Sequence, residues 1–544
     1  MNYLQKKKLA FMSIVNKVKG FVRTVFGVPP ITLPDCVDND SLINYTIEGN
    51  SVQDGEPTPE APIEVESVGD KTKNLFNYSE ATVLKRYSSS TIKHENGKIV
   101  VNKTTNVAQE RITITVPTPK KNTDMIVSLK GENLMSGYGL YMSDTIPTTT
   151  WDGSSVSSSL NTGEYNYLNI VFAISTTAVG AIIIYDIQLE EGTKKTSYEP
   201  YGYKIPVVCS GKNILNPSNF DFISGNAWSR YDKWTLVKAN TKYTFSIKKL
   251  INCKSYRINF ALFDKSKNLI QNTTGANKYE WADYIVISNN LGMGYYWGTG
   301  HIFVMNGNLT TLNNIVLTFI PKQDMYISFF LQHGDVTTST YVENPQIEVG
   351  SKTDYEPYVK PVITNIYLDE PLRKLGNHAD YIDFKNQKVV RKVSETILKG
   401  TEECTFINGD TSPSYERIYY IHSVFGSTAG ESLCNAIKTT NSSNSGWGGT
   451  KFVIHVGSNG IFIYRPAYSG VLPDITSKKA WNNFLAERYQ NGNPIKLYYI
   501  LAEAIEEIIS IPNISTFKGT TIYSVETSVQ PSNMSATYYS TSKE

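Results

Sequence analysis

Aromatic rings set among glycines are the residues of this chain best suited to bind a ligand. The stretch NLGMGYYWGTGH, 290–301, places Tyr295, Tyr296 and Trp297 between glycines, a composition typical of an exposed loop. The flat face of such a ring stacks on the C–H side of a sugar, while nearby amides, hydroxyls and carboxylates bond its hydroxyls. This stretch is our first candidate for a ligand site. The alternative is that these rings fill a core or a subunit interface.

The tryptophans extend this candidate site. Four of the seven lie between residues 208 and 362, and Trp447 lies in NSSNSGWGGT, a stretch without apolar neighbours. Trp447 is our second loop candidate, with a ring folded onto its own domain as the alternative. The further candidate rings are Trp228, Trp234, Trp281 and Trp447.

Catalytic patterns are weak. The six histidines contain no i, i+4 pair, so a helical zinc motif is absent, and no nucleophile elbow, P-loop or dinucleotide fingerprint occurs. The nearest approach to a catalytic cluster is His378, Asp380 and Asp383 in NHADYIDF, which we interpret as a solvated linker. We therefore expect no enzyme.

Carboxylates near the ends of two strands raise the question of calcium. Asp186, Glu190, Glu343 and Glu348 carry hard oxygen ligands, but their spacing is not diagnostic. We interpret them as strand-surface carboxylates and expect no cofactor, with a structural calcium ion left open.

Composition excludes several classes of protein. With 52 Lys and Arg against 50 Asp and Glu, the net charge of +2 selects neither nucleic acid nor a membrane surface. The cysteines are five, far apart and without metal spacing: Cys36, Cys209, Cys253, Cys404 and Cys434. The longest apolar run, at 178–185, is much shorter than the ~20 residues of a membrane-spanning helix. We expect reduced thiols and no membrane span.

The N-terminal segment 1–36 is predicted to hold an anchoring helix and a connector. Lysines 6–8 precede an apolar stretch, but Asn16, Lys17 and Lys19 interrupt it and no cleavage site follows, so we expect no signal peptide. An apolar stripe at 4-3-4-3 spacing predicts one helix face, formed by Phe11, Val15, Val18, Val22 and Val25. We expect this face to dock on a partner. The alternatives are packing on the chain's own core and binding to a membrane surface.

Beyond residue 35 the pattern is mainly β. The Asn96-Gly97 and Asn459-Gly460 dipeptides predict tight hairpin turns between alternating strands, and Asn386-Gln387 is a third candidate turn. One later helix is predicted at about 478–491, with Trp481 on its apolar face and in the core.

A repeat divides the chain. KNLFN at 73–77 and KNILN at 212–216 open two segments, which QLEEGTKKTSYEPY at 188–201 and QIEVGSKTDYEPY at 346–358 close. We predict two tandem antiparallel β-sandwich modules, 72–207 and 208–362. Segment 37–71 is predicted as a Pro- and Gly-rich linker or strands, and 363–544 as a β-rich domain with the one helix, which could borrow strands from 31–70.

Three phrases carry a family resemblance: GNSVQDGEPTPEAPIEVESVGDKTKNLF, QLEEGTKKTSYEPYGYKIPV and SVQPSNMSATYY. They resemble segments of minor tail, baseplate and receptor-binding proteins of tailed phages that infect Gram-positive bacteria. The resemblance implies jelly-roll modules similar to carbohydrate-binding modules, and attachment to a host surface glycan. It also implies a virion location after assembly in the host cytoplasm, an anchoring N-terminal segment that meets other tail proteins, and a homo-oligomer, with a trimer favoured.

Two alternatives stay open. A purely structural virion component would use the sandwiches for subunit packing, and a glycan-cleaving tail enzyme would need paired carboxylates about 5–9.5 Å apart. The candidate residues above predict binding rather than cleavage.

Overall fold

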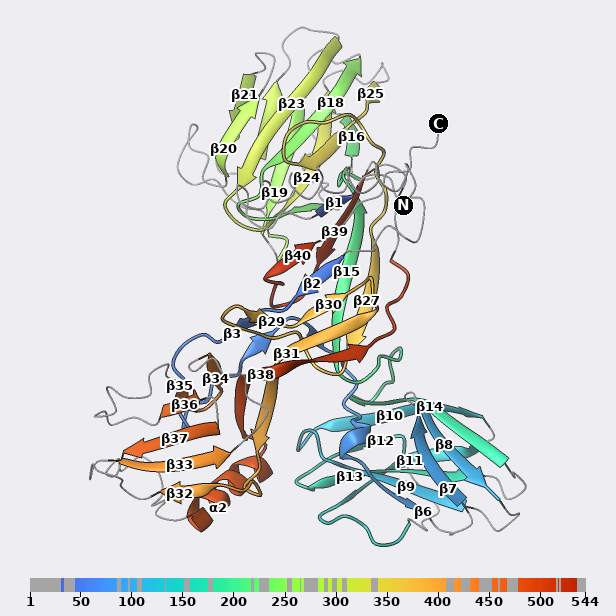
Figure 1. The fold of residues 1–544 in the computed structure, drawn as a ribbon. Helices are drawn as coiled ribbons and strands as arrows, with labels where there is room; N and C mark the ends of the chain where they lie inside the picture. The colour runs from blue at the N-terminus through green and yellow to red at the C-terminus, as the bar shows by residue number, and fades with distance from the viewer. Residues whose placement is uncertain are drawn as a thin grey trace, which may run out of the picture.

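The chain is mainly β and forms a central body from which three further bodies project (Figure 1). The structure is a computed structural model. It describes residues 31–33, 45–85, 90–95, 98–104, 110–132, 134–150, 157–174, 180–216, 220–224, 234–251, 257–264, 266–268, 282–287, 292–295, 301–305, 311–333, 341–407, 415–421, 431–439, 453–457, 460–466, 478–514, 517 and 520–535.

The central body is a sandwich built from segments that lie far apart in the sequence. Its first sheet has the order β1 (Ile31–Leu33), β39 (Thr521–Val525), β15 (Tyr203–Gly211), β27 (Val362–Leu368), with β5 (Asp70–Lys71) also on β15. Its second sheet has the order β34 (Ser432–Cys434), β38 (Ile495–Ile508), β31 (Lys388–Leu398), β30 (Tyr381–Asp383), β2 (Thr46–Glu48), β40 (Asn533–Ser535). Buried residues of both sheets form one core, which includes Tyr45, Ile205, Ile366, Val389 and Tyr523.

Two short ribbons complete the central body. They are β3 (Ser51–Val52) with β4 (Glu66–Ser67), and β28 (Lys374–Leu375) with β29 (His378–Ala379). Segment 45–71 therefore supplies strands to this body, in line with the expectation that the C-terminal region could borrow strands from 31–70.

Module 1 is a sandwich of a four-stranded and a five-stranded sheet. The first has the order β11 (Leu134–Ser143), β13 (Tyr167–Ile174), β9 (Glu110–Pro117), β6 (Thr82–Lys85). The second has the order β12 (Ser159–Asn161), β10 (Asp124–Glu132), β14 (Gly180–Glu191), β8 (Lys98–Lys103), β7 (Ser90–Glu95), and a 3₁₀ turn, η2 (Tyr78–Glu80), precedes them. Apolar residues of both sheets meet in one core, which contains Val101, Ile114, Leu168 and Ile184.

Module 2 also consists of two sheets. One has the order β16 (Phe220–Ser224), β24 (Met325–His333), β19 (Arg257–Phe263), β22 (His301–Met305), β21 (Gly292–Tyr295), with β17 (Thr235–Val237) on β24. The other has the order β20 (Ala282–Ile287), β23 (Thr311–Pro321), β18 (Tyr243–Ile251), β25 (Tyr341–Glu343), with β26 (Gln346–Val349) on β18. The pairing is antiparallel except between β16 and β24.

The two modules share their strand connections. Six strands of each module correspond one to one when they are taken in chain order. In module 1 they are β9 to β14, which form the sheets β11-β13-β9 and β12-β10-β14. In module 2, β17, β18, β19, β23, β24 and β26 form the corresponding sheets β19-β24-β17 and β23-β18-β26. Strands β20 to β22 are an addition between β19 and β23.

The chain leaves one sheet of the central body to form each module and returns to the same sheet on a neighbouring strand. Module 1 lies between β5 and β15, which pair antiparallel, and module 2 lies between β15 and β27, which also pair antiparallel. The boundary expected at 207/208 thus falls inside β15. Because both ends of a module lie side by side, each sandwich projects from the central body like an enlarged hairpin loop (Figure 1).

The last body is inserted between β31 and β38. Its sheet has the order β32 (Thr405–Ile407), β33 (Tyr415–Ile421), β37 (Gly460–Pro466), β36 (Val453–Gly457), β35 (Lys438–Thr439). The helix expected near 478–491 is α2 (Lys478–Gln490), and its Trp481 and Leu485 are buried. The described residues of 363–544 therefore divide between this body and the central one. No helix in the described part of the chain is long and apolar enough to cross a membrane.

The three predicted hairpins are confirmed. Strand β7 pairs with β8 across residues 96–97, β36 pairs with β37 across 458–459, and β30 pairs with β31 beside Gln387, whose φ is +49°.

Candidate functional site

Most of the predicted ligand-binding rings lie outside the described residues: Trp228, Trp281, Tyr296, Trp297 and Trp447. The backbone of Tyr295 ends β21, in the addition that distinguishes module 2 from module 1. The residues of the predicted docking helix also lie outside: Phe11, Val15, Val18, Val22 and Val25.

Trp234 is the predicted ring whose surroundings are described. It is half-buried, just before β17, and its ring centroid lies 6.1 Å from that of Phe263 and 6.4 Å from that of Tyr326. The Lys267 ammonium lies 4.3 Å from the centroid of the Trp234 ring and 5.8 Å from that of Tyr326. These four residues form the Trp234 cluster, which joins β17, β19, β24 and the turn after β19.

A tight turn positions Lys267. The Asp264 carboxylate accepts hydrogen bonds from the backbone N–H of Asn268 (2.8 Å) and from its side-chain amide (3.0 Å). These bonds hold the pKa of Asp264 below its usual range. Lys267 takes a positive φ of 65° within this turn, and its backbone N–H donates to the Asp264 carbonyl oxygen (3.0 Å). The turn therefore directs an exposed lysine back over the ring.

The Trp234 cluster combines apolar rings with a hydrogen-bond donor. Because Lys267 lies over one face of Trp234, a sugar ring would meet the remaining ring surface and the lysine ammonium rather than that covered face. Such a site can hold a hydroxylated ligand, but it contains no acid–base pair.

The phrase that closes each module hydrogen bonds to the phrase that opens it. Asn74 donates its side-chain amide to the carbonyl oxygens of Ile187 (2.9 Å) and Glu199 (3.1 Å). Its side-chain oxygen accepts from the backbone N–H groups of Phe76 (3.0 Å) and Leu189 (3.1 Å). We call this arrangement the Asn clasp of module 1.

Module 2 has the same clasp around Asn213. Its amide donates to the carbonyl oxygens of Pro345 (3.2 Å) and Glu356 (3.1 Å). Its side-chain oxygen accepts from Leu215 and Ile347, both at 3.1 Å. The repeated opening and closing phrases therefore join the two ends of each sandwich where it attaches to the central body.

Two of the four carboxylates considered for calcium, Glu190 and Glu348, are buried and bond within the closing phrases, so our interpretation of them as strand-surface groups was wrong. Glu190 accepts from the backbone N–H of Thr196 (2.8 Å) and from its hydroxyl (2.6 Å), and Glu348 accepts in the same way from Thr353 (2.8 and 2.5 Å). Asp186 and Glu343 pair with Lys130 (2.8 Å) and Lys248 (2.5 Å). Among the described residues, no group of three or more His, Cys, Asp or Glu side chains is placed to hold a metal ion.

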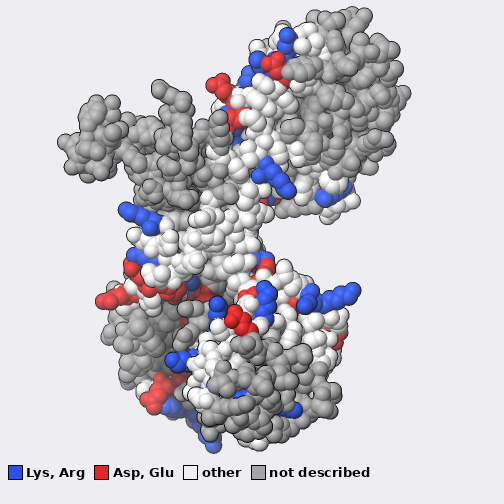
Figure 2. All heavy atoms as spheres, turned by 90° about the vertical axis from the view of Figure 1, so that its right-hand side faces the viewer, with Lys and Arg blue, Asp and Glu red and all other residues white. Residues whose placement is uncertain are grey.

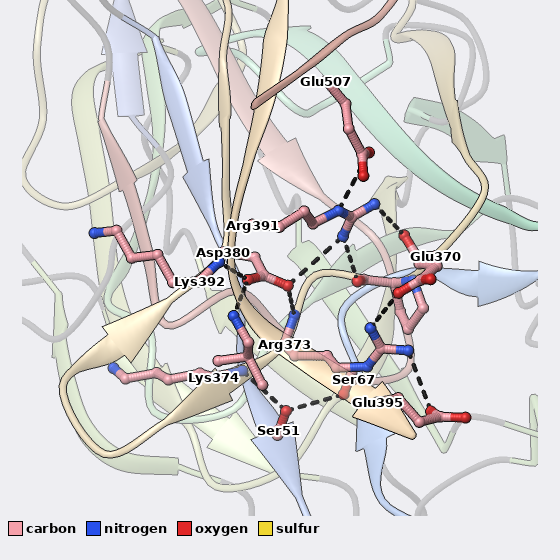
Figure 3. A network of polar contacts seen from close by, with 12 residues as sticks. Ser51, Ser67, Glu370, Arg373, Lys374, Asp380, Arg391, Lys392, Glu395 and Glu507 are labelled. Atoms are coloured by element: carbon pink, nitrogen blue, oxygen red, sulfur yellow. Dashed lines mark hydrogen bonds and ion pairs between the residues drawn. The ribbon is translucent and has the colours of Figure 1, made fainter. Parts of the chain in front are cut away.

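A buried ionic network occupies the central body (Figure 3). Asp380 is fully buried, and one of its carboxylate oxygens accepts from the backbone N–H groups of Lys392 (2.7 Å) and Val393 (2.9 Å). These two donors face Asp380 because β31 has an irregular register between Arg391 and Val393. The other oxygen accepts from the backbone N–H of Arg373 (3.0 Å).

Two buried arginines surround Asp380. Arg391 donates to the carbonyl oxygens of Pro371 (2.7 Å) and Glu370 (2.9 Å), and its Nη1 lies 3.6 Å from Asp380. Arg373 forms ion pairs with Glu370 (2.5 Å) and Glu395 (3.2 Å). Burial raises the pKa of Asp380, and it raises the pKa of the neighbouring Tyr203 to about 12.

The network corrects our interpretation of NHADYIDF as a solvated linker. Asp380 is part of the core, while Asp383 accepts from Asn386 to stabilise the β30–β31 turn, and His378 lies 3.8 Å from Glu431. The three side chains do not form one reacting group. Since Asp380 meets only backbone donors and arginines, its arrangement is structural.

The sequence did not indicate which residues would join Trp234 in the Trp234 cluster or Asp380 in the ionic network. Phe263, Lys267 and Tyr326 are distant from Trp234 in the sequence, and the ionic network joins residues from 51 to 507. One signal was present: an aspartate between apolar residues of a short strand pattern, as in NHADYIDF, indicates a buried acceptor as well as a solvated one.

No known family model matches this chain, and no curated protein matches it.

Proposed function

We propose that this chain is a tail-tip or baseplate protein of a tailed phage that binds carbohydrate on the host cell surface. The resemblance of its opening and closing phrases supports the virion assignment. In this proposal the N-terminal segment meets other tail proteins, the chain forms a homo-oligomer, with a trimer favoured, and each module is a jelly roll.

The observation that carries the proposal is the mounting of the two sandwiches. Both are inserted through side-by-side ends into adjacent strands of one sheet, and both are closed by the same Asn clasp. This arrangement fixes the base of each module and leaves the opposite end of the sandwich away from the central body (Figure 1). Binding residues are often carried by loops that a rigid scaffold positions.

The ligand class follows from the candidate residues. The Trp234 cluster offers ring surface beside a lysine ammonium, and the glycine-rich stretch with Tyr295, Tyr296 and Trp297 belongs to the same module. Rings with nearby hydrogen-bonding groups are suited to sugars.

A glycan array probed with the full-length protein tests this proposal. Saturable binding that Trp234→Ala or Trp297→Ala weakens about tenfold supports it, because that loss corresponds to roughly one ring contact. Tyr489→Ala is the matched control, since this 38% exposed ring lies on α2 of another body. Binding to tail proteins but to no glycan would favour the purely structural component, and turnover of a bound polysaccharide would favour the tail enzyme.

A further inference from the structure

Lys267 brings to the Trp234 cluster a positive charge that forms no ion pair with an acid in the described part of the chain. The acids of the neighbouring turns have other partners. Asp264 accepts from the backbone N–H and the side-chain amide of Asn268 (2.8 and 3.0 Å). Asp324, just before β24, accepts from the backbone N–H of Ala239 (2.8 Å) and lies 3.4 Å from the Lys238 ammonium. The Lys267 ammonium, 4.3 Å from the centroid of the Trp234 ring, therefore keeps its charge for a ligand.

The backbone of Lys267 has a conformation that other residues adopt at lower cost. Its φ of 65° lies in the left-handed region, which glycine and asparagine enter more readily than lysine. The hydrogen bonds that close the turn use the backbone N–H of Lys267 and groups of Asp264 and Asn268, and none of them uses the lysine side chain. Closure of the turn thus does not explain a lysine at this position, whereas its contact with the rings does.

The rings of the Trp234 cluster lie on the outer face of their sheet. In β24, Met325 and Ile327 are buried, and successive residues of a strand point to opposite faces, so Tyr326 between them points away from that core. Phe263 is directly opposite Tyr326 in the register of β19 and β24, so it lies on the same face. Because Trp234 and Tyr326 are only half-buried, a ligand can reach them from outside the sandwich.

Module 1 has no such ring and lysine on the corresponding face. Asn169 follows the core residue Leu168 in β13, so it too points away from the core. It is fully buried, accepts from the hydroxyl of Thr115 (2.6 Å) and donates to that of Ser143 (2.9 Å). The turn after β11, at 144–148, contains no lysine. On this face, a ring covered by a lysine is therefore a property of module 2 and not of the shared sandwich.

The position of the lysine favours one class of saccharide. A neutral sugar can stack on the covered face of Trp234 only by displacing the ammonium, whose attraction to the ring is then lost. A phosphate, sulfate or carboxylate group on the sugar can instead pair with the ammonium, while the sugar packs beside it on Tyr326 and the open part of Trp234. An anionic group thus gains a charged partner that a neutral sugar does not use.

The surrounding charges do not override this selection. On the face that Figure 2 shows, the described surface of module 2, at the top, carries Lys and Arg side chains interspersed with Asp and Glu side chains. The net charge of +2 also gives the whole chain no strong field of one sign. Discrimination between charged and neutral sugars therefore depends on the single cation that contacts the rings.

We infer that Lys267 is the specificity-determining residue of the Trp234 cluster, and that this cluster binds saccharides that carry an anionic group in preference to neutral ones. The inference rests on the proposed carbohydrate-binding function and names the ligand class of that same site.

A glycan array that holds neutral, phosphorylated, sulfated and uronic acid forms of the same saccharides tests the inference with the full-length protein. We expect the binding that Trp234→Ala weakens to be at least about tenfold stronger for an anionic form than for its neutral form, and Lys267→Asn to remove this preference. Added salt should weaken binding of the anionic form to the unmodified protein more than to Lys267→Asn. Either anion supports the inference, and the form that binds best identifies the anion.

Three variants separate binding from folding. Lys267→Asn should not lower the midpoint of thermal unfolding, because asparagine adopts the left-handed conformation at lower cost than lysine. Lys267→Arg keeps the charge and should keep most of the affinity. Lys248→Gln is the matched control, because this lysine is 61% exposed and lies on the other sheet of the same module.

Two results would overturn the inference while leaving the proposed function intact. One is Trp234-dependent binding of neutral saccharides that Lys267→Asn leaves unchanged. The other is saccharide binding that Trp297→Ala removes and that both Trp234→Ala and Lys267→Asn leave unchanged. Absence of binding to every saccharide would overturn both the inference and the proposed function.

Discussion

Asn74 and Asn213 make the same four hydrogen bonds in two different sandwiches. Each donates to the carbonyl oxygen of the residue just before the closing phrase and to that of the glutamate in YEPY, and each accepts one backbone N–H from its own opening phrase and one from the last strand. A single buried amide thus joins the first and last residues of a module. This relationship explains why both modules have a KN motif at their start and a Q-x-E-x-G motif near their end.

Asn74→Ala should destabilise module 1 by about 3 kcal/mol, because it leaves buried backbone groups of Phe76, Ile187 and Leu189 without their partner. Hydrogen exchange of the full chain, followed by mass spectrometry, reads each body separately, as a multi-body protein requires. Protection should fall in 82–191 and stay unchanged in 220–349. Asn213→Ala should give the reverse pattern, and equal loss in both modules from either variant would contradict independent clasps.

Asp380→Ala should destabilise the central body by about 3–5 kcal/mol, since it leaves Arg373 and Arg391 buried with fewer negative partners. Asp383→Ala, which removes only the exposed contacts to Asn386, is the control and should cost about 1 kcal/mol. Denaturant unfolding followed by exchange in β15, β31 and β39 measures both. A cost for Asp380→Ala no larger than that of the control would show that the network does not hold this body together.

Stability should fall in acid partly through Glu356. Its carboxylate accepts from Thr520 (2.8 Å for the N–H and for the hydroxyl) and pairs with Lys212 (2.9 Å). Burial opposes the charge, but these partners hold the pKa of Glu356 below its ordinary 4.5. The contribution is therefore complete above about pH 4.5 and is lost as the pH falls through the lower folded pKa. Asp380 acts in the opposite sense, because burial raises its pKa.

Glu356→Gln should accordingly cost about 1.5–3 kcal/mol at pH 7 and less at pH 3, so its acid limb is flatter than that of the unmodified protein. Glu343→Gln is the matched control, because its partner Lys248 is 61% exposed and a surface pair contributes at most about 1 kcal/mol. Thermal unfolding from pH 7 to 3 measures both variants. An unchanged slope for Glu356→Gln would contradict this role.

Trp481→Ala should destabilise the last body by about 3–5 kcal/mol, since this fully buried ring packs with Leu485, Leu497 and Tyr499. Tyr489→Ala on the same helix, at an exposed position, should change stability by less than about 0.5 kcal/mol. Near-ultraviolet circular dichroism during thermal unfolding distinguishes them.

Local patterns predicted local structure well. The three turn signals correctly predicted that the strands on either side of them pair as hairpins, because such residues favour the backbone angles of tight turns. The periodicity around Trp481 also marked a helix with a buried face. The Q-x-E-x-G and YEPY phrases indicated two equivalent units whose strands are connected alike.

Long-range pairing could not be predicted in this way. The central body combines strands from 31–33, 46–71, 203–211, 362–398, 432–434 and 495–535, and periodicity within one strand does not identify its neighbour. For the same reason the sequence predicted a solvated Asp380, although backbone groups of β31 donate to it in the core. The close approach of Gly202 to the end of β27 likewise joins residues more than 150 positions apart.

Binding of the full-length protein to a glycan array tests the central claim most directly. The account predicts concentration-dependent binding to a defined set of saccharides, weakened about tenfold by Trp234→Ala or Trp297→Ala and retained by Tyr489→Ala. A folded protein that binds no saccharide on the array, but associates tightly with purified tail proteins, would contradict it.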